Sequence, residues 1–391
     1  MAKWNEFNVM PGMTTWIDMP PDYKKQYYIH QEKTKKRKEN KRKEAEQIKK
    51  LTSSKTLTPI QLEQMKRVIK ESKVGVDAHL SNMMDDKFFA ELNKDISHKQ
   101  GLKKILLISD VRGWAWWNKS QYLKYYLSDE FNFDIINVIG PGAQGVPNDG
   151  YDLYFTYGFS YIDRLRRIPK NKKMTGVTAH RPESVIRTAM RKTNHIHANS
   201  IMLMEEVKKF NENVHYVPNG VDENLFRPIK PITPHGELMV GHVGKKCKEK
   251  GQSNIIQPAI AKAGANSYVN TNDYRNKLPY CQMWQKYQDF DIFIVASDED
   301  GTPNPALEAA ACGRPIISNR IGNMPEFIRD GYNGFLVEKN IDAYVEKIKW
   351  CMDHKEEVAR MGENARKTVL DGWTWKIQSE KYRKMFREVT R

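Results

Sequence analysis

Short apolar segments, separated by stretches of helical spacing, recur along the chain from residue 103 onward. The first set comprises residues 104–109, 133–140, 151–158, 174–180, 195–200 and 214–220. Apolar runs that alternate with helices at intervals of roughly 15 to 25 residues are typical of βα units, whose strands form a parallel sheet. The pattern therefore predicts an α/β domain over residues 103–228.

A second set of apolar segments predicts a second domain of the same kind. It follows the proline-rich residues 227–236, which lack periodicity and are interpreted as a linker. Its members are LMVGHVG, ANSYVN, FDIFIVAS, PIISN and GFLV. We therefore predict two Rossmann-like domains that face each other across a cleft, the second over residues 229–372. Apolar residues at helical intervals in residues 373–391 predict a closing helix that packs on the rest of the chain.

The first hundred residues lack the strand pattern. Residues 33–50 hold ten Lys or Arg and three Glu, a net charge of +7, and residues 58–73 have helical spacing. We predict a helical, basic N-terminal extension over residues 1–102. The charged run is interpreted either as a solvated helix or arm, or as a contact for nucleic acid or a membrane surface.

Composition restricts the class of protein without choosing its partner. The 391 residues suffice for two domains, and the formal charge of +16, from 64 basic and 48 acidic residues, favours anionic partners such as nucleic acid, anionic lipid or nucleotides. Neither an apolar membrane span nor a secretory leader is readable in the sequence. The four cysteines are widely spaced and form no C-x-x-C pair, which fits a reducing compartment. The expected location is cytoplasmic.

Two loops at the ends of predicted strands suit an anionic ligand. The lysine-rich GKKCKEKG at residues 244–251 follows one strand, although taken alone it is better explained as a solvated basic loop. In DGTPNPALE at residues 300–308, two acids flank a turn that leads into a helix beginning near Pro305. Free N–H groups at a helix start attract phosphate, and carboxylates accept hydrogen bonds from sugar hydroxyls. A capped helix with an acidic first turn is the alternative.

Together these segments resemble the family 4 retaining glycosyltransferases of GT-B fold. Four motifs occur in the family's order, at residues 217–228, 244–251, 300–328 and 333–337. The resemblance extends from about residue 103 to about residue 386 and omits the first hundred residues. It implies a hexosyltransferase-type enzyme that uses a nucleotide-sugar, UDP- or GDP-linked, as donor.

The resemblance also implies roles for individual residues of the second domain. Asp300 would contact the hydroxyls of the donor sugar, and Glu308 the nucleotide ribose. Lys245 and Lys250 would face the diphosphate. Two positions depart from the family's pattern. The first acid is usually Glu, whereas here it is Asp300, or Glu299 with a shifted turn. The first basic residue is usually Arg, whereas here it is Lys245.

Further roles follow from the same resemblance. The turn formed by Thr302, Pro303 and Asn304 would offer backbone groups to the phosphate, although Pro303 has no N–H. Gly113 matches the glycine loop under the reaction centre, and His180 matches a histidine close to the transferred sugar, where it would position and polarise the donor.

The implied mechanism is metal-independent transfer with retention at the anomeric carbon. Negative charge that develops on the leaving diphosphate would be stabilised by the two lysines and the helix start. The sequence contains no Asp-x-Asp pattern, and no metal is expected. The residues expected to act in catalysis are His180, Asp300 and Lys250.

Two features bear on the acceptor. Trp114, Trp116 and Trp117 follow Gly113 and would either stack on a base or a sugar or pack in the core. Residues 164–173 carry six basic side chains and no acid, a composition that suits phosphates. These six are Arg164, Arg166, Arg167, Lys170, Lys172 and Lys173.

Three hypotheses for the acceptor remain open at this point. The one that the charge favours is a hydroxymethylated base in DNA, which would make the chain a DNA-modifying member of the family. The second is a lipid-linked or cell-envelope saccharide at an anionic membrane surface. The third is a non-catalytic nucleic-acid-binding protein on a GT-B scaffold.

Overall fold

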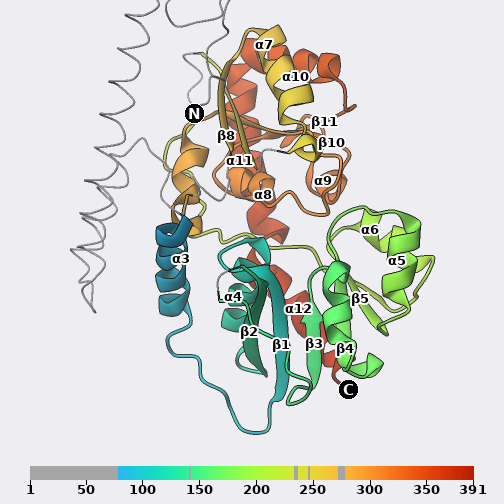
Figure 1. The fold of residues 1–391 in the computed structure, drawn as a ribbon. Helices are drawn as coiled ribbons and strands as arrows, with labels where there is room; N and C mark the ends of the chain where they lie inside the picture. Colours follow the sequence, from blue (N-terminus) through green and yellow to red (C-terminus); the bar gives the residue numbers. More distant parts are fainter. Residues whose placement is uncertain (1–77, 141, 233–236, 245–246, 272–277) are drawn as a thin grey trace, which may run out of the picture. The chain divides into compact units, whose positions relative to one another are not determined.

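A computed structural model describes residues 78–391, except for residues 141, 233–236, 245–246 and 272–277. The charged run at residues 33–50, the expected helix at residues 58–73 and Lys245 lie outside the described residues. The two predicted α/β domains lie within them (Figure 1).

The first domain is built on a six-stranded, fully parallel sheet with the order β2-β1-β3-β4-β5-β6. These strands are apolar along their length because a parallel sheet is covered on both faces. Ile105 and Leu106 are adjacent in β1, so their side chains point to opposite faces, and both are completely buried. Its strands are β1 (Lys103–Val111), β2 (Phe131–Ile139), β3 (Leu153–Thr156), β4 (Lys173–Val177), β5 (His195–Ala198) and β6 (Val214–Tyr216). Its helices are α4 (Ala115–Leu127), α5 (Glu183–Met190) and α6 (Ile201–Lys208), with short η2 (Phe159–Leu165) and η3 (Lys170–Lys172).

The second domain contains a five-stranded parallel sheet with the order β11-β10-β9-β7-β8. Its strands are β7 (Met239–Gly244), β8 (Asn266–Thr271), β9 (Ile292–Val295), β10 (Ile316–Asn319) and β11 (Gly334–Val337). The helices are α7 (Gln257–Ala263), α8 (Asn304–Ala311), α9 (Met324–Phe327), α10 (Ile341–Asp353) and α11 (Lys355–Gly372). Shorter helical turns are η4 (Lys248–Lys250), η5 (Gln252–Ile256) and η6 (Tyr280–Gln288). All eleven predicted strands are present, and the predicted fold class is confirmed.

The last helix, α12 (Trp375–Val389), packs on the first domain although it follows the second (Figure 1). Tyr382, Met385 and Phe386 share a hydrophobic core with Phe131 and Phe133 of β2. The expected closing helix is therefore present, and its buried face explains the helical spacing of its apolar residues.

Helix α3 (Ala78–Leu92) precedes the first strand and contacts the second domain. Its Phe89 stacks on Tyr280 of η6 with ring centroids 5.8 Å apart, and the Asp85 side chain accepts a hydrogen bond of 3.1 Å from the Cys281 N–H. None of the four cysteines, all of which lie in the described part of the chain, forms a disulfide. Helix α3 belongs to neither sheet and packs against η6 of the second domain.

The strand directions bring the candidate motifs together. Because parallel strands end at one edge of a sheet, loops after β1 and β4 share an edge of the first sheet, and loops after β7 and β9 share an edge of the second. The two edges touch: Gly301 N donates to Thr178 O over 2.8 Å, and Thr302 Oγ1 donates to Asn199 O over 3.3 Å. A Cβ on Gly301 would overlap Asn199, so only glycine allows this approach.

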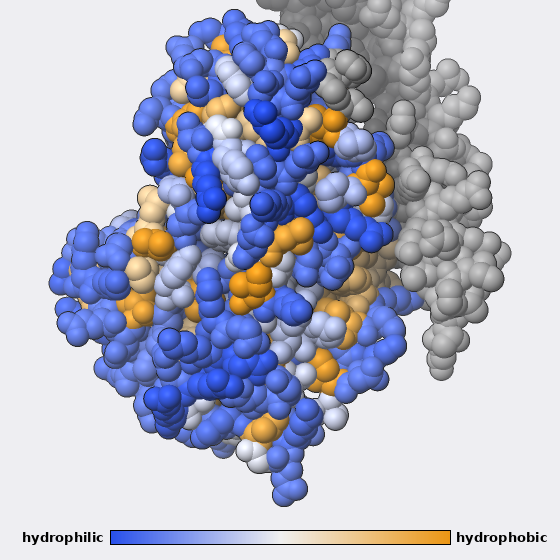
Figure 2. Space-filling view, turned by 180° about the vertical axis from the view of Figure 1, so that it is seen from behind, coloured by the Kyte–Doolittle hydropathy of each residue, from blue (hydrophilic) through white to orange (hydrophobic). Residues whose placement is uncertain are grey.

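The face drawn in Figure 2 is mostly hydrophilic, and its apolar residues occur in small, separate groups. Of the helices in the described part of the chain, none combines the length and apolar character needed to span a bilayer. The high surface polarity agrees with the low mean hydropathy of −0.72.

Candidate active site

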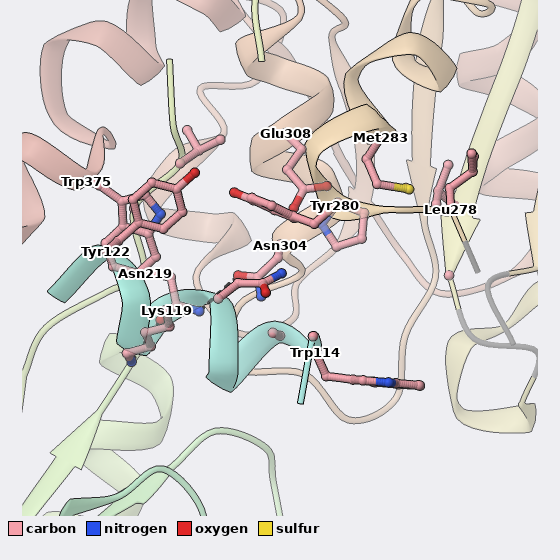
Figure 3. A pocket seen from close by; sticks show the side chains of 18 residues that line it. Trp114, Lys119, Tyr122, Asn219, Leu278, Tyr280, Met283, Asn304, Glu308 and Trp375 are labelled. Carbon is pink, nitrogen blue, oxygen red and sulfur yellow. Dashed lines mark hydrogen bonds between the residues drawn. The ribbon is translucent and has the colours of Figure 1, made fainter. Parts of the chain in front are cut away.

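A cavity of about 210 Å³ opens where the carboxyl edges of the two sheets meet (Figure 3). The first domain contributes Gly113, Trp114 and the start of α4, while the second contributes the end of β7 and the start of α8. Gly113 has φ of 75°, a conformation that glycine adopts without strain, and this turns the chain from β1 into α4. Gly113, Trp114, Asn304 and Glu308 are the predicted site residues that line the cavity.

Helix α8 places Glu308 in the cavity wall. The helix begins at Asn304 with Pro305 in its first turn, where the missing N–H is not needed and the fixed φ favours a helix. Glu308 lies one turn further on, and Tyr287 Oη donates to its Oε2 over 2.5 Å. Burial raises the pKa of this carboxyl to about 7. Near neutral pH the group therefore exists in both protonation states and is able either to donate or to accept a hydrogen bond.

Lys250 and Asp300 form a direct ion pair, with Nζ and Oδ2 2.5 Å apart. Both side chains are partly buried. Gly251, which follows Lys250 with φ of 70°, lies so close to the backbone of Ala296 that a Cβ would overlap it. This close approach brings the η4 turn beside the end of β9, where the loop carrying Asp300 begins. The residues expected at the diphosphate and at the sugar thus contact each other.

His180 lies on the loop after β4, and its Nδ1 is 2.8 Å from a carboxylate oxygen of Glu206 on α6. That contact holds the imidazole ring in one orientation. The next residue, Arg181, forms an ion pair with Glu299 of the second domain. His180 is not part of the cavity wall described above, but it stands on the same edge of the sheet as Thr178, which contacts Gly301.

The turn before α8 is largely buried. Thr302 accepts a hydrogen bond of 3.1 Å from Asn323 Nδ2, and the Asn323 N–H donates to Gly301 O over 2.9 Å. Pro303 precedes the first residue of the helix. These bonds fix the expected phosphate-binding turn, Thr302, Pro303 and Asn304, within the second domain, and the bond from Thr302 Oγ1 to Asn199 O joins it to the first.

The three tryptophans after Gly113 have different positions. Trp114 lines the cavity, where it is partly exposed. Trp116 packs edge-on against Tyr161 with centroids 5.8 Å apart, and Trp117 is buried with the Arg112 guanidinium 5.1 Å from its ring centroid. Of the two interpretations of this segment, packing therefore holds for Trp116 and Trp117, and Trp114 is the one beside the candidate site.

The basic stretch lies elsewhere in the first domain. It enters β4 from its amino end, so it stands at the edge of the sheet opposite to Gly113. Arg164, Arg166, Arg167, Lys170 and Lys172 are exposed. Lys173 corrects the expectation of six exposed cations, because it is buried and its Nζ donates to Leu165 O over 3.1 Å. The structure does not bring this stretch into the cavity.

Sequence reasoning missed one cation in the cavity wall. Lys119 of α4 is 3% exposed, and its Nζ donates to Asn219 Oδ1 over 3.0 Å. The signal in the sequence was its position on the apolar face of the helix, three and four residues before Tyr122 and Leu123.

An aromatic wall was missed as well. Tyr122 stacks on Trp375 with centroids 5.5 Å apart, and Tyr280 lies beside them in the same cavity. Figure 3 shows Tyr122 and Trp375 at one end and Met283 and Leu278 at the other, with Tyr280 and Glu308 between them. These residues come from distant parts of the sequence, so no local pattern joins them.

Comparison with known proteins matches most of the second domain to one family. Residues 270–368 match the family model of the glycosyl transferases group 1. An uncharacterized glycosyltransferase of Methanocaldococcus jannaschii, MJ1178, is 34% identical over 100 residues, which is 25% of this chain and 28% of that protein. The MMP alpha-(1->4)-mannosyltransferase of Mycolicibacterium hassiacum is 23% identical over 190 residues, which is 42% of this chain and 46% of that protein. The chain thus aligns with less than half of the length of either relative.

A solved structure extends the likeness to the fold of both domains. The Anabaena protein Alr3699/HepE in complex with UDP-glucose superposes with a TM-score of 0.57 at 15% identity, covering 73% of this chain and all of that one. At that identity the likeness concerns the fold. The comparisons confirm the resemblance inferred from the sequence motifs: residues 270–368 match the group 1 glycosyl transferase model, and the two domains have the GT-B fold.

Proposed function

We propose that this chain, whose second domain matches the group 1 glycosyl transferases, moves a hexose from a nucleotide-sugar to an acceptor hydroxyl. The observation that carries the proposal is the cavity at the meeting carboxyl edges. There Glu308 and Asn304 at the start of α8 face Gly113 and Lys119 of the other domain. Ligand sites in open α/β sheets lie at this edge of the strands.

The donor we propose is a UDP- or GDP-linked sugar. Glu308 would hydrogen-bond the ribose hydroxyls, and the aromatic wall around Tyr280 offers a flat surface for a base. The positive end of the α8 dipole and Lys250 favour a diphosphate beside them. The UDP-glucose complex of the structurally similar Anabaena protein supports this choice.

The proposed chemistry depends on charge stabilisation. When the bond between the anomeric carbon and the diphosphate breaks, negative charge develops on the phosphate oxygens, and Lys250 and Lys245 would stabilise it. Lys250 would then exchange Asp300 for the phosphate, leaving the Asp300 carboxylate for the sugar hydroxyls. His180, held by Glu206, would polarise the sugar. We propose that transfer proceeds with retention and without a metal, as the family resemblance implies.

For the acceptor we favour a hydroxymethylated base in DNA. The formal charge of +16 and the exposed arginines and lysines at residues 164–172 support a polyanionic acceptor. They would attract the DNA backbone from the opposite edge of the sheet, and Trp114 at the cavity would contact the base. A saccharide acceptor is the second candidate, which the mannosyltransferase relative favours.

The test is a matrix of donors and acceptors with the full-length protein. UDP-, GDP- and ADP-glucose and GDP-mannose are each combined with hydroxymethylated DNA, unmodified DNA, an oligosaccharide pool and anionic vesicles, and released nucleotide and product mass are recorded. Sugar mass on hydroxymethylated DNA alone is the expected result. Transfer only to saccharide or lipid would overturn the DNA acceptor. DNA binding without nucleotide release from any donor would instead support a non-catalytic scaffold.

A matched pair of variants ties the activity to the cavity. Glu308→Gln removes the carboxyl from the wall, whereas Glu363→Gln changes an exposed glutamate on α11. Loss of nucleotide release in the first variant alone assigns the reaction to this site. Equal activity in both would place the reaction elsewhere.

A further inference from the structure

The cavity wall holds a lysine that none of the expected roles uses. Lys119 lies on α4, and its Nζ is 4.9 Å from the ring centroids of both Tyr157 and Tyr382. The side chain is 3% exposed. Within the described part of the chain, no carboxylate forms an ion pair with it. Its hydrogen-bond acceptor is the neutral amide of Asn219.

The lysine is connected to the start of α8 by two amides. Asn219 accepts from Lys119 Nζ, and its own Nδ2 donates to Asn304 Oδ1 over 2.9 Å (Figure 3). Gly220 lies against the backbone of Trp375, where a Cβ would not fit, so the turn that carries Asn219 is fixed. A continuous chain of hydrogen bonds therefore runs from the buried amine to the first residue of the helix whose positive end faces the cavity.

This environment is unfavourable for a charged lysine without a ligand. Burial lowers the pKa of Lys119 well below its usual value, because an ammonium group loses its hydration there and gains no carboxylate. A neutral amine beside a cavity becomes an ammonium group when an anion enters, since the attraction between opposite charges in a poorly solvated site offsets the lost hydration.

We propose that Lys119 binds the diphosphate of the nucleotide and takes up one proton from solvent as the nucleotide enters the cavity. The inference rests on the proposed nucleotide-sugar donor and adds a cation from the first domain to the lysines of the second. Lys119, Asn219 and Asn304 would then link the two domains through the bound phosphate. No bond of the donor breaks in this step.

The other titratable groups around Lys119 must be considered as possible acceptors of this proton. Burial lowers the pKa of His197 well below its usual value, and it raises the pKa of the surrounding tyrosine hydroxyls, so these groups stay neutral near pH 8. The tyrosines are Tyr122, Tyr157, Tyr280 and Tyr382. Glu308 lies across the cavity, and burial raises its pKa to about 7. At pH 8.5 its carboxylate is mostly ionised and could itself accept a proton when an anion enters, so Glu308→Gln is needed to distinguish it from Lys119.

The experiment is calorimetric titration of the full-length protein with UDP and GDP at pH 8.5, in two buffers of different ionisation enthalpy. Lys119→Met keeps an unbranched side chain of similar length and removes the amine, and Lys124→Met on the same helix is the matched control. We expect wild type and Lys124→Met to take up about one proton on binding. Lys119→Met should take up none and bind roughly 10- to 100-fold more weakly, the range expected when a hydrogen bond to a charged group is removed.

Three comparisons keep the test decisive. Glu308→Gln is expected to bind nucleotide more weakly, but at saturating nucleotide it should still take up about one proton per nucleotide bound, because the proton belongs to Lys119. Uridine and guanosine, which lack phosphate, should show no uptake. The uptake by wild type is measurable even if Lys119→Met fails to fold, and its absence in a protein that binds UDP or GDP overturns the inference. Equal affinity and uptake in Lys119→Met and wild type also overturns it. Failure of wild type to bind any nucleotide would refute the proposed function itself.

Discussion

The two edges of the first sheet hold their cations in different ways. At the carboxyl edge Lys119 is buried, tied to Asn219 and enclosed by two aromatic rings. At the amino edge the cations of residues 164–172 are exposed. A buried amine without a counter-ion interacts strongly with an anion that fills its cavity, whereas exposed charges act weakly and over longer distances. A high density of basic residues in the sequence therefore indicates an exposed surface, whereas the basic residue proposed to act on the ligand is identified by its burial in the structure.

The difference assigns the two edges separate tasks. The carboxyl edge meets the second domain and holds Glu308, Lys250 and Asp300 near the cavity. The amino edge shares none of these contacts. We expect changes at the carboxyl edge to affect the reaction and changes at the amino edge to affect the attraction of a polyanionic acceptor.

The largest expected effect comes from the carboxyl of Glu308. Glu308→Ala should lower kcat/KM for sugar transfer by about 100-fold or more, since it removes a hydrogen bond to a charged group and leaves the Tyr287 hydroxyl without its partner. Initial rates of nucleotide release would be measured beside those of Glu363→Ala. A change of less than twofold in Glu308→Ala would break the assignment of chemistry to this edge.

Glu308 should also make stability depend on pH. Its pKa of about 7 exceeds the ordinary 4.5, so the unfolded chain loses this proton at lower pH than the folded one. Its favourable contribution is present below about pH 4.5 and is lost as pH rises to about 7. Glu308→Gln should therefore gain stability relative to wild type between pH 5 and 8, by at most about 3 kcal/mol. Urea unfolding at both pH values measures the difference, and a constant difference would contradict the assignment.

Helix α3 is expected to act on the donor through Tyr280. Phe89→Ala removes the ring that stacks on Tyr280 and should raise the KM for the donor by roughly fivefold, with a smaller change in kcat, because an aromatic pair contributes about 1 kcal/mol. Lys87→Ala, on the exposed side of the same helix, is the control. Equal KM values in the two variants would contradict the proposed effect of α3 on donor binding.

The smallest effect on donor use is expected at the amino edge. The combined substitution of Arg166, Arg167 and Lys170 by Ala should leave the KM for the donor unchanged. If DNA is bound there, the slope of log K against log salt should fall by roughly 0.9 for each DNA phosphate that the variant no longer neutralises. Binding to a labelled duplex at several salt concentrations measures this slope. A rise in the donor KM of this variant would contradict the assignment of donor binding to the carboxyl edge alone.

Features confined to one stretch of sequence could be predicted. The eleven strands were visible because strands of parallel sheets are apolar along their whole length, as at Ile105 and Leu106. Glu308 and Asn304 were visible because one short motif contains them both. Asn219 also lies in one of the four motifs, but its bonds to Lys119 and Asn304 join three distant segments.

Features that depend on tertiary contacts were not predictable in the same way. Lys173 looked like one more exposed cation, but its position at the start of β4 buries it and pairs its Nζ with Leu165 O. Tyr280 enters the site because α3 stacks against it, and no sequence pattern links Phe89 to Tyr280. Burial of a single lysine among aromatic residues is decided by packing, and charge patterns in a sequence do not report packing.

The most direct test of the central claim is amide hydrogen exchange of the full-length protein with and without saturating UDP, GDP or ADP. We predict that at least one nucleotide protects residues 113–122, 219–222, 278–283 and 304–308, and that amide exchange in residues 164–172 is unchanged. Protection of residues 164–172 with no change in the four cavity segments would contradict it, because the nucleotide would then bind at the amino edge of the sheet.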